Sequence, residues 1–549
     1  MFDSLVKKIK ERYLINKNYV YILSFFIPII ILLNIYAGIW LYPFGNNMYL
    51  ARDMYHQYAP FFSEFYNKLL GGSSLSYSWN IGMGTNFMGL YAYYLSSPIN
   101  WLLVLIKREY LIEFMNLLII LKIALSSLTF TYYLSKHFKR KDLMMVGLSL
   151  FYALSSYVAA YSWNIMWLDC LVLLPLIILG LEKLVKENKG YLYCITLGLS
   201  IISNYYISFM ICIYCILYFM VLLFTNKSGQ AWTYYKKRLI SFAVFSALAG
   251  GFAAFLLIPE YYALKVSASG DISFPDTINR YFSIYEIISR GLMNVEVSAT
   301  TNNDPNIYSS VLVFLLLPLY WLLATRNKKE KIGKTLLVGF FIVTFNFNIS
   351  NFIWHGFHFP NSLPCRQSFI FIFLILSMSY ESLINIKRFR SKQIYGVFTG
   401  TLLLFLSYEH FLVDETYDFP IIYLSILFLI LYLFVLQLYK SKRKKALLLF
   451  LLVAIAEVVI NFNGTGLSTV TREYYTNDNE GIESILNTIE EKDDSFYRIE
   501  KYKRRTKNDG AWHQYKGVSI FSSTAYAGLN DFQKALGFES SMNASSFYG

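Results

Sequence analysis

The chain has 549 residues, of which 56% are hydrophobic, 19% aromatic and only 15% charged, and its mean hydropathy is +0.42. A soluble protein carries about a quarter charged residues, whereas apolar runs long enough for a ~30 Å hydrocarbon core recur along this sequence. The composition therefore excludes a wholly soluble protein and indicates a polytopic membrane protein. The formal net charge of +14 comes from Lys and Arg between the apolar runs, which points to membrane topology and not to nucleic-acid binding.

The N-terminal region sets the expected topology. Residues 1–18 are rich in Lys and Arg, and an apolar run follows from about Tyr19 to Trp40. Because basic residues are enriched on the cytoplasmic side, we expect the N-terminus in the cytoplasm. No small-residue cleavage site follows the run, which indicates a retained anchor.

The next stretch, Tyr49–Trp101, is then expected on the outer face. It is too polar to cross a bilayer and too aromatic for an ordinary solvated loop. We predict that it folds onto the outer surface of the membrane, and that the wider outer loop, residues 41–110, carries the active site.

The apolar run Leu90–Ile106 within this region allows two topologies. If it crosses, the basic cluster Lys136–Lys141 falls outside, against the usual charge distribution; if it lies along the surface or re-enters, the cluster falls inside. Ser96-Ser97-Pro98 also interrupts the run, and proline disrupts a continuous helix. We predict that this run does not cross.

Further spans follow along the chain. We expect them near Met144–Ser162, Trp167–Leu184, Tyr191–Phe224 (two short spans broken at Asn204-Tyr205-Tyr206), Leu239–Ile258 and Ser310–Thr325. Predicted outer turns are Trp163–Met166, Pro259–Tyr308, Ser350–Arg366 and Leu412–Pro420. The expected fold is mainly α, a polytopic helical bundle over residues 1–461 with about thirteen spans and an external C-terminus.

The C-terminal segment, residues 462–549, is more polar. Gly517–Phe521 alternates polar and apolar residues, which suggests a strand. We expect an extracytoplasmic segment that begins a larger α/β or β domain. Nothing before Gly549 closes a core, so either the chain is a fragment or this part packs on the membrane domain.

Asp53 is the leading candidate for chemistry, because a carboxylate near the membrane is costly unless it is used or paired. In a helix, Asp53, His56, Gln57 and Pro60 share one face, and Asp53 has His56, Gln57 and Tyr58 within hydrogen-bonding reach. The alternative is a surface pair of Arg52 and Asp53 at the start of an interfacial helix. The spacing leaves both interpretations open.

Other candidates lie at expected outer ends of spans. Asp169 is either a second acid of the site or a residue that begins a helix. Arg366 either holds a phosphate bidentately or snorkels to the membrane interface. Lys122 lies in the middle of a span and must face the bundle interior or reach an end. Some aromatic residues are suited to stack on sugar or line a prenyl groove, unless they form a membrane belt: Tyr55, Tyr58, Trp79, Tyr93 and Tyr94.

No cofactor is firmly implied. His355 and His358 have i, i+3 spacing but no acidic cluster accompanies them, so the case for a divalent metal is weak. The sequence contains no Walker loop, dinucleotide-binding glycine motif or HExxH.

Several segments together resemble the bacterial YfhO-type membrane protein family. They are Asp53–Tyr58, Ser78–Gly84, Tyr93–Asn100, Leu174–Ile177, Asn204–Tyr206, Ile258-Pro259, Leu363–Phe369 and Phe496–Arg498. The resemblance implies a GT-C-type, multi-span glycosyltransferase of the hexosyltransferase class in the bacterial cell membrane. It also implies a sugar donor on undecaprenyl phosphate and transfer on the outer face to a cell-envelope polymer such as lipoteichoic or wall teichoic acid. By position, Asp53 corresponds to the catalytic base of the first outer loop.

The residues fit this mechanism. A sugar on a lipid phosphate is already activated, so the enzyme needs a base for the acceptor hydroxyl and a cation for the departing phosphate. Asp53 suits the first role and Arg366 the second, and an inverting displacement needs no covalent intermediate. Two other classes stay open: a transporter or flippase of a lipid-linked glycan, for which no internal repeat is visible, and a non-catalytic envelope assembly protein.

Overall fold

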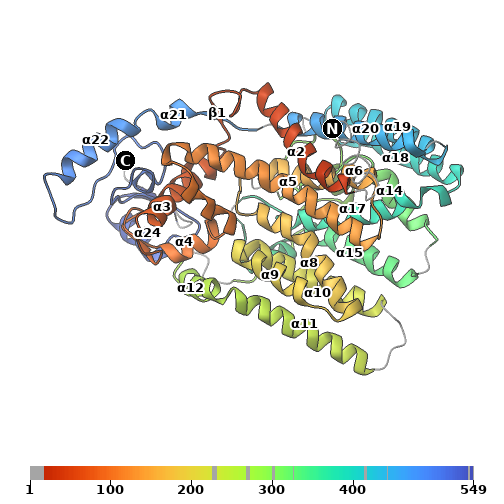
Figure 1. The fold of residues 1–549 in the computed structure, drawn as a ribbon, viewed down its shortest axis with the longest axis horizontal. Helices are drawn as coiled ribbons and strands as arrows, with labels where there is room; N and C mark the ends of the chain where they lie inside the picture. The colour runs from red at the N-terminus through yellow and green to blue at the C-terminus, as the bar shows by residue number, and fades with distance from the viewer. Residues whose placement is uncertain are drawn as a thin grey trace, which may run out of the picture.

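The structure is a computed structural model that describes residues 18–225, 232–267, 273–299, 303–324, 327–360, 362–412, 417–441, 443–465, 467–541 and 545–547. Long helices pack into a bundle, whereas the outer stretch and the C-terminal segment gather at one end (Figure 1). The mainly α-helical architecture expected from the sequence is confirmed. The basic N-terminal flank, apart from Asn18, and part of the predicted turn Leu412–Pro420 lie outside the described residues.

Among the described residues, six segments are long and apolar enough to cross a membrane. They are α2 (Tyr19–Gly38), Arg108–His137 with α5 (Leu111–His137), Leu143–Tyr161 with α6 (Leu143–Ala153) and α7 (Ser156–Tyr161), α10 (Tyr205–Thr225), α19 (Phe419–Ser441) and Lys445–Gly464 within α20 (Arg443–Gly464). If the bent pair α11 (Trp232–Phe252) and α12 (Ala254–Lys265) forms one span, the number of such segments is seven. Three shorter apolar helices are α9 (Tyr191–Ser203), α14 (Val313–Leu322) and α17 (Ser368–Ile384). The count of about thirteen spans stays a prediction.

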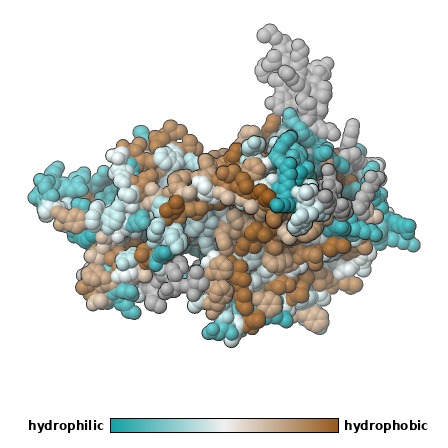
Figure 2. All heavy atoms as spheres, turned by 90° about the horizontal axis from the view of Figure 1, so that it is seen from below, coloured by the Kyte–Doolittle hydropathy of each residue, from teal (hydrophilic) through white to brown (hydrophobic). Residues whose placement is uncertain are grey.

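The remaining helices complete the bundle. They are α8 (Leu168–Glu187), α13 (Ile284–Ser289), α15 (Lys328–Asn346), α16 (Asn348–Trp354), the 3₁₀ turn η5 (Ile386–Arg388) and α18 (Ser391–Phe411). Hydroxyl groups join neighbouring helices: Ser24 and Thr131 lie 2.7 Å apart between α2 and α5. Such bonds are a common means of helix association in a membrane, because lipid tails are as apolar as the helix surfaces and no hydrophobic force drives the helices together. Figure 2 shows apolar surface in brown over the bundle, with polar surface in teal at the end formed by the C-terminal segment and in patches toward the opposite end.

The predicted breaks between helices are partly right. Asn204 separates α9 from α10 as expected. The predicted outer loop Pro259–Tyr308 is wrong at its start, because Pro259 lies inside α12, which runs to Lys265. The chain bends instead by 74° between α11 and α12, at Ala253. Membrane helices tolerate proline where neighbouring groups satisfy the freed backbone.

The outer stretch is built from short elements. They are β1 (Asn47–Met48), the π-helix η1 (Met54–Tyr58), α3 (Ala59–Leu70), β2 (Tyr77–Ser78), β3 (Thr85–Asn86), α4 (Phe87–Tyr94), and the 3₁₀ helices η2 (Pro98–Leu105) and η3 (Arg108–Tyr110). The run Leu90–Ile106 is divided between α4 and η2 at Leu95–Ser97. Each piece has eight residues, too few to cross a bilayer.

The C-terminal segment packs on this outer stretch, which was one of the two alternatives left by the sequence. Its elements are β4 (Val470–Thr471), α21 (Arg472–Thr476), α22 (Asn479–Glu490), α23 (Asp509–His513), β5 (Ile520–Phe521), α24 (Ala527–Ala535), β6 (Glu539–Ser541) and β7 (Ser545–Phe547). β4 pairs with β1, and β5, β7 and β6 form an antiparallel sheet in that order. Only the last two residues of the predicted strand Gly517–Phe521 are in a strand. Ser63 of α3 and Arg108 both donate hydrogen bonds to the carbonyl oxygen of Trp512, at 3.1 and 2.6 Å.

Candidate functional site

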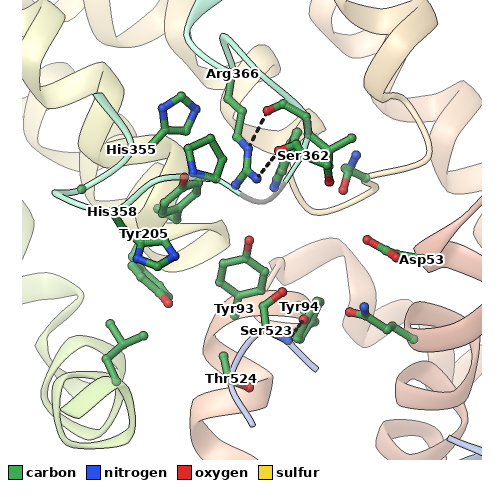
Figure 3. A pocket seen from close by; sticks show the side chains of 18 of the residues that line it. Asp53, Tyr93, Tyr94, Tyr205, His355, His358, Ser362, Arg366, Ser523 and Thr524 are labelled. Carbon is green, nitrogen blue, oxygen red and sulfur yellow. Dashed lines mark hydrogen bonds between the residues drawn. The ribbon is translucent and has the colours of Figure 1, made fainter. Parts of the chain in front are cut away.

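A cavity of about 460 Å³ lies where the outer stretch, the 355–366 segment and the C-terminal segment meet. Figure 3 shows side chains from all three segments around it. Six of the residues that the sequence suggested for acid–base chemistry, phosphate binding or sugar stacking line this cavity: Asp53, Gln57, Tyr58, Tyr93, Tyr94 and Arg366. The structure therefore brings the proposed base and the proposed phosphate-binding residue to one space.

Asp53 directly precedes the π-helix η1. In a π-helix the i→i+5 hydrogen bond replaces the i→i+4 bond. The residues one wider turn after Asp53 are therefore Gln57 and Tyr58, and not His56 and Gln57 as in an α-helix. Gln57 and Tyr58 line the cavity with Asp53, whereas His56 does not. The prediction that His56 shares the functional face is thus not supported, because it assumed α-helical geometry.

Arg52 is not bonded to Asp53. Arg52 adopts a left-handed backbone (φ 50°), and its Nη1 donates a hydrogen bond of 2.6 Å to the carbonyl oxygen of Ala299. No ion pair between Arg52 and Asp53 occurs in the part of the chain that the structure describes. Burial raises the pKa of Asp53, and the positive charges of Arg366, Arg52 and Lys507 offset only part of that rise. The surface-pair interpretation of Asp53 therefore loses its basis.

Arg366 is held rigidly at the cavity wall. Its Nε donates to the carbonyl oxygen of Leu363 at 3.0 Å and its Nη2 to that of Ser362 at 3.1 Å, as the dashed lines in Figure 3 show. The guanidinium also lies 5.0 Å from the ring centroid of Trp167 and 5.1 Å from that of Tyr206. These two bonds use the N–H of Nε and one N–H of Nη2. A ligand would accept hydrogen bonds from the remaining N–H groups of the two terminal Nη atoms.

No carboxylate among the described residues lies within 4.0 Å of the Arg366 guanidinium. A largely buried cation without a carboxylate partner is costly, because burial removes its hydration. The site is thus suited to an anion supplied by a ligand.

Two histidines lie beside Arg366 on the same wall. Nδ1 of His355 is 2.7 Å from the carbonyl oxygen of Asn351, so that nitrogen carries the proton. Burial, with Arg366 adding to it, lowers the pKa of His355 to about 3, and the same causes lower the pKa of His358. Both rings are neutral at pH 7. Within the described ranges, no group of three or more His, Cys, Asp or Glu side chains is arranged to hold a metal ion.

The C-terminal segment contributes the outer side of the cavity. Phe521, Ser523, Thr524 and Ala525 line it, and the backbone N–H of Ser523 donates a 2.8 Å hydrogen bond to the Tyr94 hydroxyl. The sequence analysis did not assign these residues to the site. A strand-like segment distant in sequence gives no signal that it will fold over the first outer loop.

Trp79 lies outside the cavity, as do Arg52 and His56. The Trp79 side chain is 47% exposed, and its ring contacts Phe496 at 5.2 Å and the guanidinium of Arg498 at 5.8 Å. Its surroundings are those of a surface contact between the outer stretch and the C-terminal segment. The proposed site therefore does not include it.

Asp169 also lies outside the cavity, in a buried ion pair. Its Oδ2 is 2.7 Å from Nζ of Lys122, and its Oδ1 accepts a 2.9 Å hydrogen bond from Ser97. Lys122 is fully buried and also donates to the carbonyl oxygen of Ile165 at 3.0 Å. The mid-span lysine thus faces the bundle interior, where Asp169 neutralises it.

Replacing Asp169 with alanine should destabilise the protein strongly, by roughly 3–5 kcal/mol, because the buried Lys122 charge loses its partner. The double variant Asp169→Leu with Lys122→Met should recover most of that loss. Thermal unfolding of the purified variants in detergent tests both expectations. Equal stability of Asp169→Ala and the parent would show that the pair carries no structural role.

The family model of the bacterial membrane protein YfhO matches residues 24–549. No curated protein matches the sequence. Among solved structures, ArnT from Cupriavidus metallidurans, crystallised with undecaprenyl phosphate, is similar at a TM-score of 0.38 and 11% identity, covering 92% of this chain and 85% of that one. That likeness is too remote to decide the function. The family match extends over nearly the whole sequence, and the chain therefore belongs to the YfhO family of bacterial membrane proteins.

Proposed function

We propose that this protein is a membrane glycosyltransferase that moves a sugar from an undecaprenyl-phosphate-linked donor to a cell-envelope polymer on the outer face. The observation that carries the proposal is the shared cavity of Asp53 and Arg366, in which Arg366 has no carboxylate partner among the described residues. The family resemblance drawn from the sequence agrees with it. Lipoteichoic or wall teichoic acid is the proposed acceptor, and a hexose the proposed sugar.

The two residues have complementary roles in such a transfer. Asp53 takes the proton of the acceptor hydroxyl as that oxygen attacks the anomeric carbon. The bond from the sugar to the phosphate oxygen breaks, and Arg366 stabilises the charge that develops on the departing lipid phosphate. One base is sufficient for an inverting displacement. A flippase has no need of a base beside its phosphate-binding group, so this pairing favours an enzyme.

The proposed topology places the N-terminus in the cytoplasm and the cavity on the outer side. The C-terminal segment, which lines the cavity, is then extracytoplasmic, and the division into a membrane domain (1–461) and an outer segment (462–549) belongs to the same proposal. The basic clusters in the loops between the apolar runs support this orientation.

The decisive experiment compares envelope polymers from cells with and without the protein by mass spectrometry, followed by transfer assays with the purified chain and undecaprenyl-phosphate hexoses. We expect one hexose substituent to disappear from a polymer when the protein is absent, and the purified chain to restore it. Identical polymers, together with no transfer from any polyprenyl-phosphate hexose, would refute the proposal.

Acidification should reduce transfer at a higher pH than an ordinary aspartate would impose. Asp53 acts as a base only when ionised, and burial raises its pKa. We therefore expect kcat/KM to be at its maximum above this raised pKa and to fall as the pH drops through it. His355 does not titrate in that range, since its pKa is lowered to about 3. A pH profile whose acid limb lies at or below ~3.9, the usual pKa of aspartate, would contradict the assignment.

A further inference from the structure

Two buried N–H donors on the cavity wall have no hydrogen-bond partner among the residues that the structure describes: Nδ2 of Asn164 and Nε1 of Trp167. The side chain of Asn164 is 0% exposed and that of Trp167 is 1% exposed. Nearly all buried polar groups in proteins are paired, and an unpaired donor is costly. Two such donors in one cavity wall therefore point to a ligand with acceptor atoms.

The turn between α7 and α8 fixes both donors in place. The Tyr58 hydroxyl donates a 2.6 Å hydrogen bond to Oδ1 of Asn164, which sets the amide so that Nδ2 is left over. The backbone N–H of Trp167 donates to the carbonyl oxygen of Asn164 at 2.8 Å. Lys122 holds the intervening Ile165 through its carbonyl oxygen at 3.0 Å. The donors thus lie on a rigid turn and need little ordering when a ligand binds.

Charge identifies the ligand. The ring of Trp167 lies against the Arg366 guanidinium at 5.0 Å, so the neutral donors share a wall with a cation that has no carboxylate within 4.0 Å among the described residues. A phosphate group offers only acceptor oxygens and negative charge, and its charge-assisted hydrogen bonds are about twice as strong as neutral ones.

We propose that the N–H groups of Asn164 and Trp167, together with Arg366, form a binding site for a phosphate oxyanion, the headgroup of a polyprenyl phosphate. The identity of the lipid rests on the proposed function; the oxyanion site itself rests on the unpaired donors. Asn164 and Trp167 bind the phosphate in the donor and in the lipid product alike.

The test is binding without turnover. Undecaprenyl phosphate, undecaprenol and inorganic phosphate are titrated into the purified full-length chain in detergent, and Kd is measured by isothermal titration calorimetry. Trp167→Phe keeps the ring under Arg366 but removes the N–H. Asn164→Asp keeps the acceptor for Tyr58 but replaces the donor with a negative charge. Each variant should bind undecaprenyl phosphate about 10- to 100-fold more weakly, the range for a hydrogen bond to a charged group, with undecaprenol binding unchanged.

Trp163→Phe is the matched control from the same turn. Its Nε1 already donates to the carbonyl oxygen of Ala160 at 2.8 Å. This variant should lower the melting temperature of the ligand-free protein and leave Kd unchanged. Trp167→Phe should leave the melting temperature unchanged and raise Kd, because its N–H makes no hydrogen bond with any described residue that the substitution could remove.

The outcomes separate this inference from the proposed function. Undecaprenyl phosphate that binds the parent, Trp167→Phe and Asn164→Asp with equal Kd would overturn the inference and leave the proposed function standing. A parent that does not distinguish undecaprenyl phosphate from undecaprenol would overturn both. Inorganic phosphate that displaces the lipid from the parent, and binds both variants more weakly, would support the oxyanion site with free phosphate as a second source of the group.

Discussion

Replacing Asp53 with asparagine should reduce sugar transfer by ~10²–10⁴-fold, the usual contribution of a positioned general base. Asparagine preserves the shape of the side chain and removes its basicity. The buried environment that raises the pKa of Asp53 also means that the neutral amide is not penalised by burial. Expression and membrane insertion should therefore stay intact, and the loss should appear in kcat with purified protein and a polyprenyl-phosphate hexose.

Glu64→Gln is the matched control for this experiment. Glu64 belongs to the same outer stretch, but it lies outside the cavity and accepts hydrogen bonds from Ser78 at 2.6 Å and Asn80 at 3.0 Å. Its replacement should lower stability and leave kcat of the folded protein close to the parental value. Near-parental transfer by Asp53→Asn would exclude Asp53 as the base. Because no other carboxylate of the described chain lines the cavity, neutral His358 would then be the next residue to test.

Much of the helical architecture could be predicted from the sequence, because about 20 apolar residues in a row have few alternatives to a membrane helix. Ser96-Ser97-Pro98 and Asn204 were correctly identified as breaks. Pro259 was wrongly taken as the end of a helix. A proline removes one backbone donor, but whether the helix stops there depends on neighbours that the sequence does not reveal.

The candidate site could be predicted only in parts. Asp53 and Arg366 stood out individually, because charged residues at the membrane surface are costly without a role. Their meeting in one cavity depends on the packing of distant segments, which no local spacing encodes. The same limit applies to Asp169, whose partner Lys122 was recognised as a mid-span charge but not paired with it.

The π-helix at Met54–Tyr58 is the clearest local failure of prediction. Spacing rules assume 3.6 residues per turn, and under that assumption His56 shares the face of Asp53. A single wider turn instead places Tyr58 in the cavity, where its hydroxyl orients Asn164. π-helical turns are rare and occur often at functional sites, so the error falls where local regularity is least informative.

Replacing Arg366 with alanine should lower kcat by ~10²–10³-fold, the typical cost of removing one group that stabilises developing negative charge. Arg366→Lys keeps the charge but loses the planar group that stacks between Trp167 and Tyr206, so it should retain only part of the activity. Steady-state kinetics with a polyprenyl-phosphate hexose measure both effects.

The pH profile provides a second readout that a loss of folding would not mimic. The charge of Arg366 lowers the pKa of Asp53 against the effect of burial. Arg366→Ala should therefore move the acid limb of kcat/KM to higher pH, whereas Arg366→Lys should leave it nearly in place. Arg498→Lys is the matched control, since Arg498 also lies over an aromatic ring and donates to backbone carbonyl oxygens, at 2.9 and 2.7 Å, but outside the cavity. Unchanged donor kinetics in Arg366→Ala, or an equal loss in Arg498→Lys, would remove Arg366 from the reaction and leave it a structural cation held by Trp167 and Tyr206.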